Sequence, residues 1–149
     1  MKGKLMQQLI KDLNADLSNE YKHMFFYLYH SAFVRGHDAL ALADLFADFA
    51  NSEAKHVRQF LDVIVSLGGT PTTKVNDFAT CKSGKDACRC AHDMENEVVA
   101  NFVDRIQQVD DLVQQGTLSP GDAIFLTGFL EEQIAESKGD KAVIFAKMM

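Results

Sequence analysis

Apolar residues recur at helical spacing in four long segments of this chain, and this pattern restricts its fold to a packing of helices. We expect helices over residues 4–35, 38–67 and 83–115, and a last helix that starts at Pro120. No segment shows the apolar and polar alternation of a β-strand. The sequence therefore predicts the all-α fold class.

One long connection, GGTPTTKVNDFATCK, separates the second expected helix from the third, whereas the other links are short. A helix of about 28 residues is ~42 Å long, a distance that about 15 extended residues can just span. The third helix can therefore start at the far end and run parallel to the second. We predict an up-down-down-up four-helix bundle with a long crossover, as a single domain over residues 1–149.

Residue types at the helix ends support these boundaries. Asp38 and Ser119 stand where N-cap side chains are common, and Pro120 suits the first position of the last helix. Gly139 is expected to kink or end that helix near its end.

The composition excludes several classes of partner. A net charge of −6 and a pI near 5.3 argue against binding to nucleic acid. Neither a signal peptide nor an apolar run of membrane-spanning length is visible, so we expect no membrane association. Three cysteines between residues 81 and 90 do not resemble a disulfide framework. We therefore expect a cytoplasmic protein.

Each apolar stripe carries a polar residue near its middle, where an apolar residue is expected. Glu97 is a useful contrast to Glu95, because it points ~160° away from the stripe at ~100° per residue and should face water. The polar residues that face inward are Glu20, Glu53, His56, Glu95 and Gln133, with Glu136 on the flank and Glu132 at the edge of the last stripe.

Four glutamates that meet inside a bundle need compensating charge. Like charges ~4 Å apart repel by about 4 kcal/mol at an effective dielectric constant of 20, and burial adds several kcal/mol per ion. Protonation could relieve this repulsion, and two divalent cations would balance the charge without it. Oxygen-rich ligands with one imidazole suit iron or manganese better than structural zinc.

Three stretches of the chain, "NEYKHMFFYLYHSA", "EAKHVRQFLDVIVSLGGTP" and "FLEEQIAE", resemble helix motifs of the ferritin-like superfamily. The resemblance is nearest to non-haem ferritins and bacterioferritins, with Dps-like ferritins also related. It implies that Glu20 and His56 bind one metal and that Glu53 bridges two metals. It further implies that Glu95 binds the second metal and that Tyr27 hydrogen-bonds a ligand carboxylate. Glu136 would take the ligand position of the last helix, with Gln133 beside it.

The chain also departs from the family pattern. Glu136 replaces the histidine of bacterioferritins, so the second metal should be held more weakly. Ala54 stands where bacterioferritins have the methionine that ligates haem, so we expect no haem. Glu132 is the only remnant of a third iron site. The 13 residues after Glu136 are too few for the fifth helix of large ferritin cages, so a Dps-like shell or a dimer is left open.

The resemblance implies a ferroxidase whose catalytic site binds two iron ions per subunit and oxidises ferrous iron with dioxygen or peroxide. Such an enzyme serves iron storage or detoxification. Two alternatives stay open: a rubrerythrin-like di-iron or dimanganese protein that handles peroxide, and a metal-free helical interaction module with protonated carboxylates. Phe26, Tyr29 and Phe33 fall on the outer face of the first helix, which predicts a homo-oligomer that assembles through this face.

Overall fold

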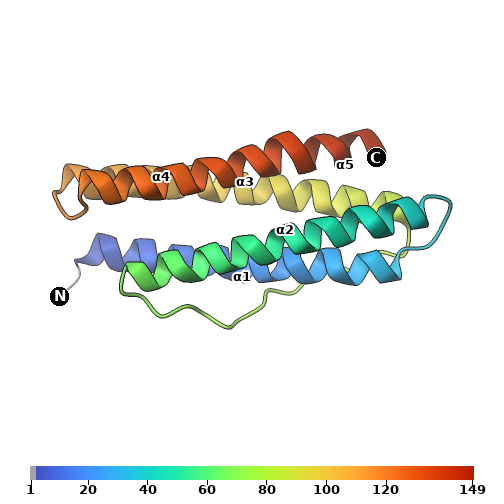
Figure 1. The fold of residues 1–149 in the computed structure, drawn as a ribbon, viewed down its shortest axis with the longest axis horizontal. Coiled ribbons are helices and arrows are strands. Elements are labelled where there is room, and N and C mark those ends of the chain that lie inside the picture. Colours follow the sequence, from blue (N-terminus) through green and yellow to red (C-terminus); the bar gives the residue numbers. More distant parts are fainter. Residues whose placement is uncertain (1–2) are drawn as a thin grey trace.

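The computed structural model describes residues 3–149, and within them the chain forms four long helical rods (Figure 1). The first three rods are α1 (Lys4–Phe33), α2 (Ala39–Ser66) and α3 (Gly84–Gln114). The fourth rod is continuous and consists of α4 (Pro120–Ala135), the π-helical segment η1 (Glu136–Ala142) and α5 (Val143–Met148). α2 and α3 run in the same direction, opposite to α1 and α4 (Figure 1). The all-α, up-down-down-up bundle is therefore confirmed.

The helix starts are capped by side chains at α3 and α4 but not at α2. Ser83 and Ser119 have extended backbones, and their hydroxyl oxygens accept hydrogen bonds from the third residue of α3 and of α4. Asp38 occupies the N-cap position of α2, as predicted, but its side chain makes no cap hydrogen bond. Its backbone, with φ −98° and ψ 9°, continues the turn at Gly36 (φ 113°) instead of adopting the extended conformation of Ser83 and Ser119.

The crossover between α2 and α3 runs along the side of the bundle and is fastened to α1 (Figure 1). The side chain of Asn14 donates to the carbonyl of Thr70 and accepts from the amide of Thr72, over 3.1 and 2.7 Å. Further along, the amide of Cys81 donates to His30 Nε2 over 2.9 Å. These bonds satisfy polar groups of a segment that has no secondary structure of its own.

The crossover also covers aromatic residues that the sequence placed on the outer face of α1. Phe26 is fully buried, and its ring packs edge-on against Phe78 of the crossover with 5.9 Å between centroids. Tyr29 contacts the same ring and stays 38% exposed. The prediction that Phe26 faces outward is wrong, because helical periodicity does not show which face the chain's own crossover will cover.

The apolar core is divided into two clusters, one toward each end of the bundle. One cluster contains Leu17, Val57 and Val98 nearest its inner edge, and the other contains Phe26 and Ala50. The buried ionisable residues of α1, α2 and α3 that the sequence singled out lie in the interval between the clusters along each helix. The fold thus places a polar layer across the middle of the bundle. No helix within residues 3–149 is both long enough and apolar enough to cross a membrane.

Candidate metal centre

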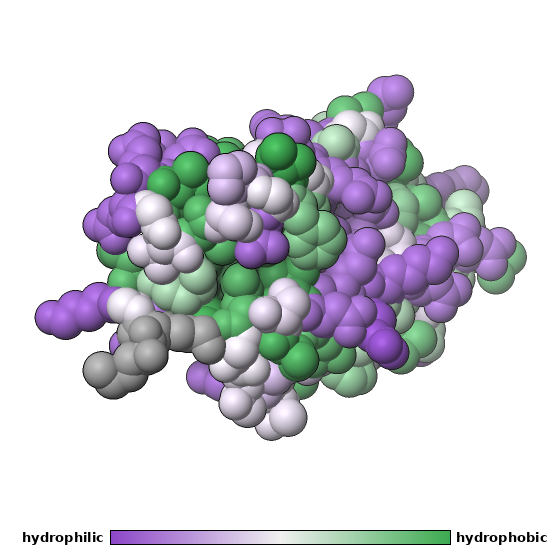
Figure 2. Space-filling view, turned by 60° about the vertical axis from the view of Figure 1, so that its left-hand side comes forward, coloured by the Kyte–Doolittle hydropathy of each residue, from purple (hydrophilic) through white to green (hydrophobic). Residues whose placement is uncertain are grey.

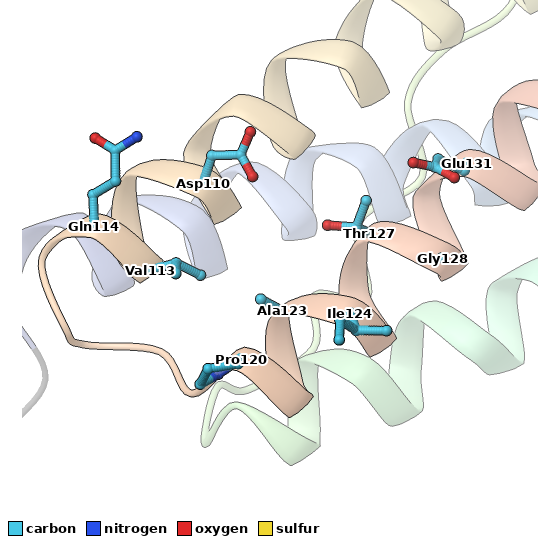
Figure 3. A pocket seen from close by; sticks show the side chains of 9 residues that line it. All are labelled: Asp110, Val113, Gln114, Pro120, Ala123, Ile124, Thr127, Gly128 and Glu131. Atoms are coloured by element: carbon cyan, nitrogen blue, oxygen red, sulfur yellow. The ribbon is translucent and has the colours of Figure 1, made fainter.

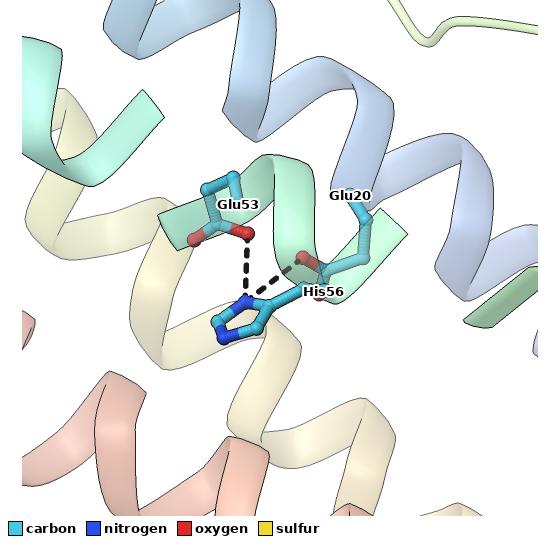
Figure 4. A group of neighbouring side chains, drawn as sticks. All are labelled: Glu20, Glu53 and His56. Carbon is cyan, nitrogen blue, oxygen red and sulfur yellow. Dashed lines mark hydrogen bonds and ion pairs between the residues drawn. The ribbon is translucent and has the colours of Figure 1, made fainter. Parts of the chain in front are cut away.

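The first group of potential ligands joins α1 to α2 and is drawn in Figure 4. Nδ1 of His56 lies 3.1 Å from Glu53 Oε2 and 3.7 Å from Glu20 Oε2. All three residues are buried, and each offers a ligand atom within 4.8 Å of the other two. Because Glu53 and His56 are three residues apart, one turn of α2 presents both to Glu20. This arrangement can hold one metal ion.

A second group shares Glu53 with the first and adds His23 and Glu95, again with ligand atoms within 4.8 Å of one another. Nδ1 of His23 lies 3.5 Å from Glu95 Oε1. The hydroxyl of Tyr27 donates to the same oxygen over 2.5 Å, as the sequence predicted for this tyrosine. Glu95 is fully buried and Glu97 is exposed, so the assignment of their faces is confirmed.

Sequence reasoning missed His23, although a signal was present. Glu20 and His23 have the same three-residue spacing on α1 as Glu53 and His56 have on α2. His23 is 1% exposed and therefore belongs to the polar layer.

Glu136 lies at the rim of the centre and contacts His56 from the side opposite to Nδ1. Its Oε2 lies 2.6 Å from His56 Nε2, and its Oε1 accepts a hydrogen bond of 2.5 Å from the hydroxyl of Ser52. Its side chain is 30% exposed. The sequence placed Glu136 with Glu95 at the second metal, whereas His23 takes that place in the second group.

The other two candidate residues of the fourth rod use their side chains elsewhere or face solvent. Gln133 is buried, and its amide donates to Gln59 Oε1 of α2 over 3.0 Å. Glu132 is exposed and, with Ser52, His56 and other residues, lines a polar hollow of about 180 Å³. This hollow reaches His56 from the surface.

Lys141 is a second residue of the polar layer that sequence reasoning missed. Its side chain is 1% exposed, and its ammonium group forms an ion pair with Glu53 Oε1. The two carboxylate oxygens of Glu53 therefore have different partners, since Oε2 faces His56.

Protons and Lys141 stabilise the acidic cluster. Burial and the nearby carboxylate of Glu53 raise the pKa of Glu20 well above its usual value. Burial alone would raise the pKa of Glu53 too, but a hydrogen bond with Glu20 and the charge of Lys141 hold it well below its usual value. Burial disfavours the imidazolium of His56, yet its interactions with the carboxylates of Glu20 and Glu53 raise its pKa to about 10. Without metal, the carboxylates are thus compensated by cationic side chains and by bound protons.

Two buried carboxylate oxygens indicate that these residues can bind metal ions. Glu20 Oε2 and Glu95 Oε2 are buried and have no hydrogen-bond partner among the described residues. Buried polar atoms are seldom left without a partner, because desolvation of such an atom is costly. One of these oxygens lies in each group of three ligands, where a cation would satisfy it.

The larger surface hollows are separate from this centre. One hollow of about 570 Å³ lies between the end of α3 and the start of α4 and is lined by apolar residues that include Val113 and Ile124 (Figure 3). Apolar and polar residues are mixed on the surface at this end of the bundle (Figure 2). The acidic residues of the hollow, Asp110 and Glu131, do not belong to the metal centre.

Comparison with known proteins gives a consistent result for the fold. A family model described as "Ferritin-like domain" matches residues 10–144. A ferritin-like, diiron-carboxylate protein from Bacillus anthracis is 24% identical, with 98% of each chain covered and a TM-score of 0.87. A DPS protein from Vibrio cholerae is 13% identical, with 97% of this chain and 91% of that chain covered and a TM-score of 0.82. A dodecameric thioferritin from Bacteroides fragilis is 17% identical, with 96% and 84% covered and a TM-score of 0.80. A search of curated proteins found no match.

Proposed function

The chain belongs to the ferritin-like domain family, and we propose that it is a ferroxidase that binds two ferrous ions in the polar layer and oxidises them. The observation that supports this proposal most directly is the pair of buried carboxylate oxygens, Glu20 Oε2 and Glu95 Oε2, that accept no hydrogen bond from the described residues. The solved proteins from Bacillus anthracis and Vibrio cholerae are described as diiron-carboxylate proteins, which adds support from the fold.

In this proposal Glu20, Glu53 and His56 hold the first ferrous ion, and His56 uses Nδ1, the nitrogen that faces both carboxylates. Nε2 of His56 then donates to Glu136. A histidine that binds metal usually donates its other ring N–H to a carboxylate or carbonyl, which fixes the ring and its tautomer. We therefore assign Glu136 to the orientation of His56, in place of the direct ligation expected from sequence.

Glu53, His23 and Glu95 form the proposed site for the second ferrous ion. Tyr27 orients Glu95 through its hydrogen bond to Oε1, which leaves Oε2 free for the metal. Haem is not part of the proposal, because Ala54 has no side-chain atom that can ligate iron. Carboxylates with two imidazoles favour iron over calcium or magnesium, which prefer all-oxygen ligands.

The redox balance of the reaction is simple. Two ferrous ions each lose one electron, and dioxygen takes up two electrons and two protons to become hydrogen peroxide. With hydrogen peroxide as oxidant, the same two electrons and two protons yield two molecules of water. The protein supplies positions for the ions and a polar layer enclosed between two apolar clusters. The polar hollow beside His56 provides a route from the surface to the first site.

The test is the rate of ferric iron formation and of oxygen consumption after ferrous iron is mixed with the protein. We expect a fast phase that saturates near two ferrous ions per chain and is absent from the Glu53→Ala variant. Glu131→Ala is the matched control, since Glu131 is exposed and lies outside the centre. Oxidation no faster than in buffer, or equal in both variants, would overturn the proposal.

We also propose that the chain assembles with copies of itself through α1. Phe25 and Leu28 are 41% and 55% exposed on this helix, beside the partly exposed Tyr29. The structurally similar protein from Bacteroides fragilis is described as dodecameric. Mass measurement in solution should give an oligomer for the natural chain and a smaller species for Leu28→Glu. A monomeric natural chain, or a mass that Leu28→Glu leaves unchanged, would contradict this assembly.

A further inference from the structure

Lys141 is an unusual residue for the middle of a helical bundle. Its side chain is 1% exposed, and its ammonium group pairs with Glu53 Oε1. The nitrogen also lies 5.5 Å from the ring centroid of Phe49 and 5.8 Å from that of Tyr27. Lysine is almost never fully buried unless it is paired, so this position requires the carboxylates around it.

The π-helical segment η1 carries Lys141 into the core. In a π-helix the backbone hydrogen bonds join residues i and i+5, so the side chains are rotated relative to those of a regular α-helix. Within η1, Lys141 is buried inside the bundle, whereas Lys138 of the same segment is exposed. Short π-helical segments occur frequently at functional sites.

We propose that the Lys141 ammonium occupies the place of the second ferrous ion beside Glu53. The two ions therefore bind in a fixed order, and the second ion binds only when the ammonium withdraws. This inference rests on the proposed function, because it concerns the same centre. It adds a step that controls the binding of the second ion, which the metal ligands alone do not provide.

The location of the ammonium supports this role. Glu53 is common to both groups of potential ligands, and its two oxygens face different cations. Oε2 faces His56 of the first group, and Oε1 is held by Lys141. An ion in the second group needs an oxygen of Glu53 as well, and Oε1 is the one that Lys141 occupies.

The balance of charge leads to the same conclusion. Glu20, Glu53 and Glu95 are the three buried carboxylates of the layer, with a formal charge of −3. One divalent ion and the Lys141 ammonium together supply +3 and neutralise them. A second divalent ion would raise the positive charge to +5 while the ammonium stays in place. At separations of ~4 Å inside a protein, the repulsion between the ammonium and a second ion is larger than the free energy of a tenfold change in affinity.

An alternative partner for the ammonium is available nearer the surface. Glu136 is partly exposed. Burial raises the pKa of Glu136, but the hydrogen bond from Ser52 and the charges of His56 and Lys141 lower it below its usual value. A lysine side chain has four rotatable bonds, so its nitrogen can move without displacement of the backbone. Withdrawal of Lys141 toward Glu136 would free Glu53 Oε1 for the second ion.

The experiment is an anaerobic calorimetric titration of the metal-free full chain with ferrous iron. For the natural chain we expect one tight ion per chain and a second ion that binds at least tenfold more weakly. Lys141→Met should tighten the second ion at least tenfold and leave the first nearly unchanged. Lys138→Met is the matched control from the same π-helical segment and should behave as the natural chain does. Lys141→Gln removes the charge but keeps a hydrogen-bond donor, so it gives the same readout if Lys141→Met does not fold.

The outcomes separate this inference from the proposed function. Two ions of equal affinity in the natural chain, or a second ion equally weak in both Lys141 variants, would overturn the role of Lys141 and leave the ferroxidase proposal standing. Absence of tight ferrous binding in the natural chain and in both variants would overturn the ferroxidase proposal itself. A merely structural role of Lys141 would lower stability without changing the ratio of the two affinities.

Discussion

Replacement of Tyr27 by phenylalanine tests how the protein stabilises a buried carboxylate without metal. The hydroxyl of Tyr27 donates to Glu95 Oε1 over 2.5 Å, and both side chains are fully buried. The other oxygen, Oε2, already lacks a partner among the described residues. In Tyr27→Phe the carboxylate loses its hydrogen bond from the hydroxyl and keeps the His23 ring, with Nδ1 at 3.5 Å.

The expected cost follows from these contacts. A hydrogen bond to a charged group contributes about 1.5–3 kcal/mol, and an unsatisfied buried acceptor retains its desolvation penalty. The ring stays in place, so no large cavity adds to the loss. We expect Tyr27→Phe to lower the free energy of unfolding of the metal-free protein by about 2–3 kcal/mol. For a chain of this size, that corresponds to a decrease in Tm of about 4–12 °C.

The assay is chemical denaturation of the chelator-treated protein, followed by circular dichroism. Tyr21→Phe is the matched control on the same helix, because the Tyr21 hydroxyl donates over 3.0 Å to a neutral carbonyl, that of Thr72, and is only partly buried. It should cost about 1 kcal/mol. If Tyr27→Phe costs no more than Tyr21→Phe, the reasoning about the buried carboxylate is refuted.

Three further predictions concern proton uptake, proton release and packing. Burial raises the pKa of Asp16 to about 6, even though Arg105 opposes the shift, so the folded state takes up its proton at a higher pH than the unfolded state does. Between pH 7 and pH 4 the stability of the natural chain relative to Asp16→Asn should therefore rise by about 2 kcal/mol, and a constant difference would contradict this pKa. Binding of the first ferrous ion near pH 7 should release protons, because the pKa of His56 is about 10 and that of Glu20 is raised well above its usual value. Calorimetry in buffers of different ionisation enthalpy measures this release, and its absence would contradict the two pKa shifts. Gly84→Ala should lower stability by about 1 kcal/mol in thermal unfolding, because its Cβ would lie 2.3 Å from Leu42 Cδ1; Gly128→Ala, with open space, should raise it, and equal effects would refute the argument.

The bundle and half of the centre could be predicted because they follow from α-helical periodicity. Glu20, Glu53 and Glu95 lie on apolar stripes of regular helices, so counting at ~100° per residue places them inside. The length of the single long connection then fixes the direction of α3. Both steps need only regular geometry.

Lys141 was missed although regular counting places it inside. It follows Leu130 by 11 residues, which at ~100° per residue puts it ~20° from Leu130 on the same stripe, but a lysine so close to the end of the chain's last apolar stripe was not expected in the core. Gly139 indicated an irregularity there, but a glycine does not specify its form. The role of Glu136 could not be predicted from its position on the helix. Its partners depend on where His56 Nε2 and the Ser52 hydroxyl point.

Phe26 illustrates a third limit. Its place on α1 was read as outward, but the side chain is fully buried and packs against Phe78 of the crossover. Irregular segments have no periodicity, so the sequence does not reveal the path of the crossover over the bundle.

The most direct test of the account is a crystal structure of the protein grown anaerobically with ferrous iron, with anomalous diffraction recorded at the iron edge. We expect a strong iron peak between Glu20, Glu53 and His56 Nδ1, and a weaker one beside Glu95 and His23. A polar layer that holds no iron, with peaks only at surface carboxylates, would contradict the central claim.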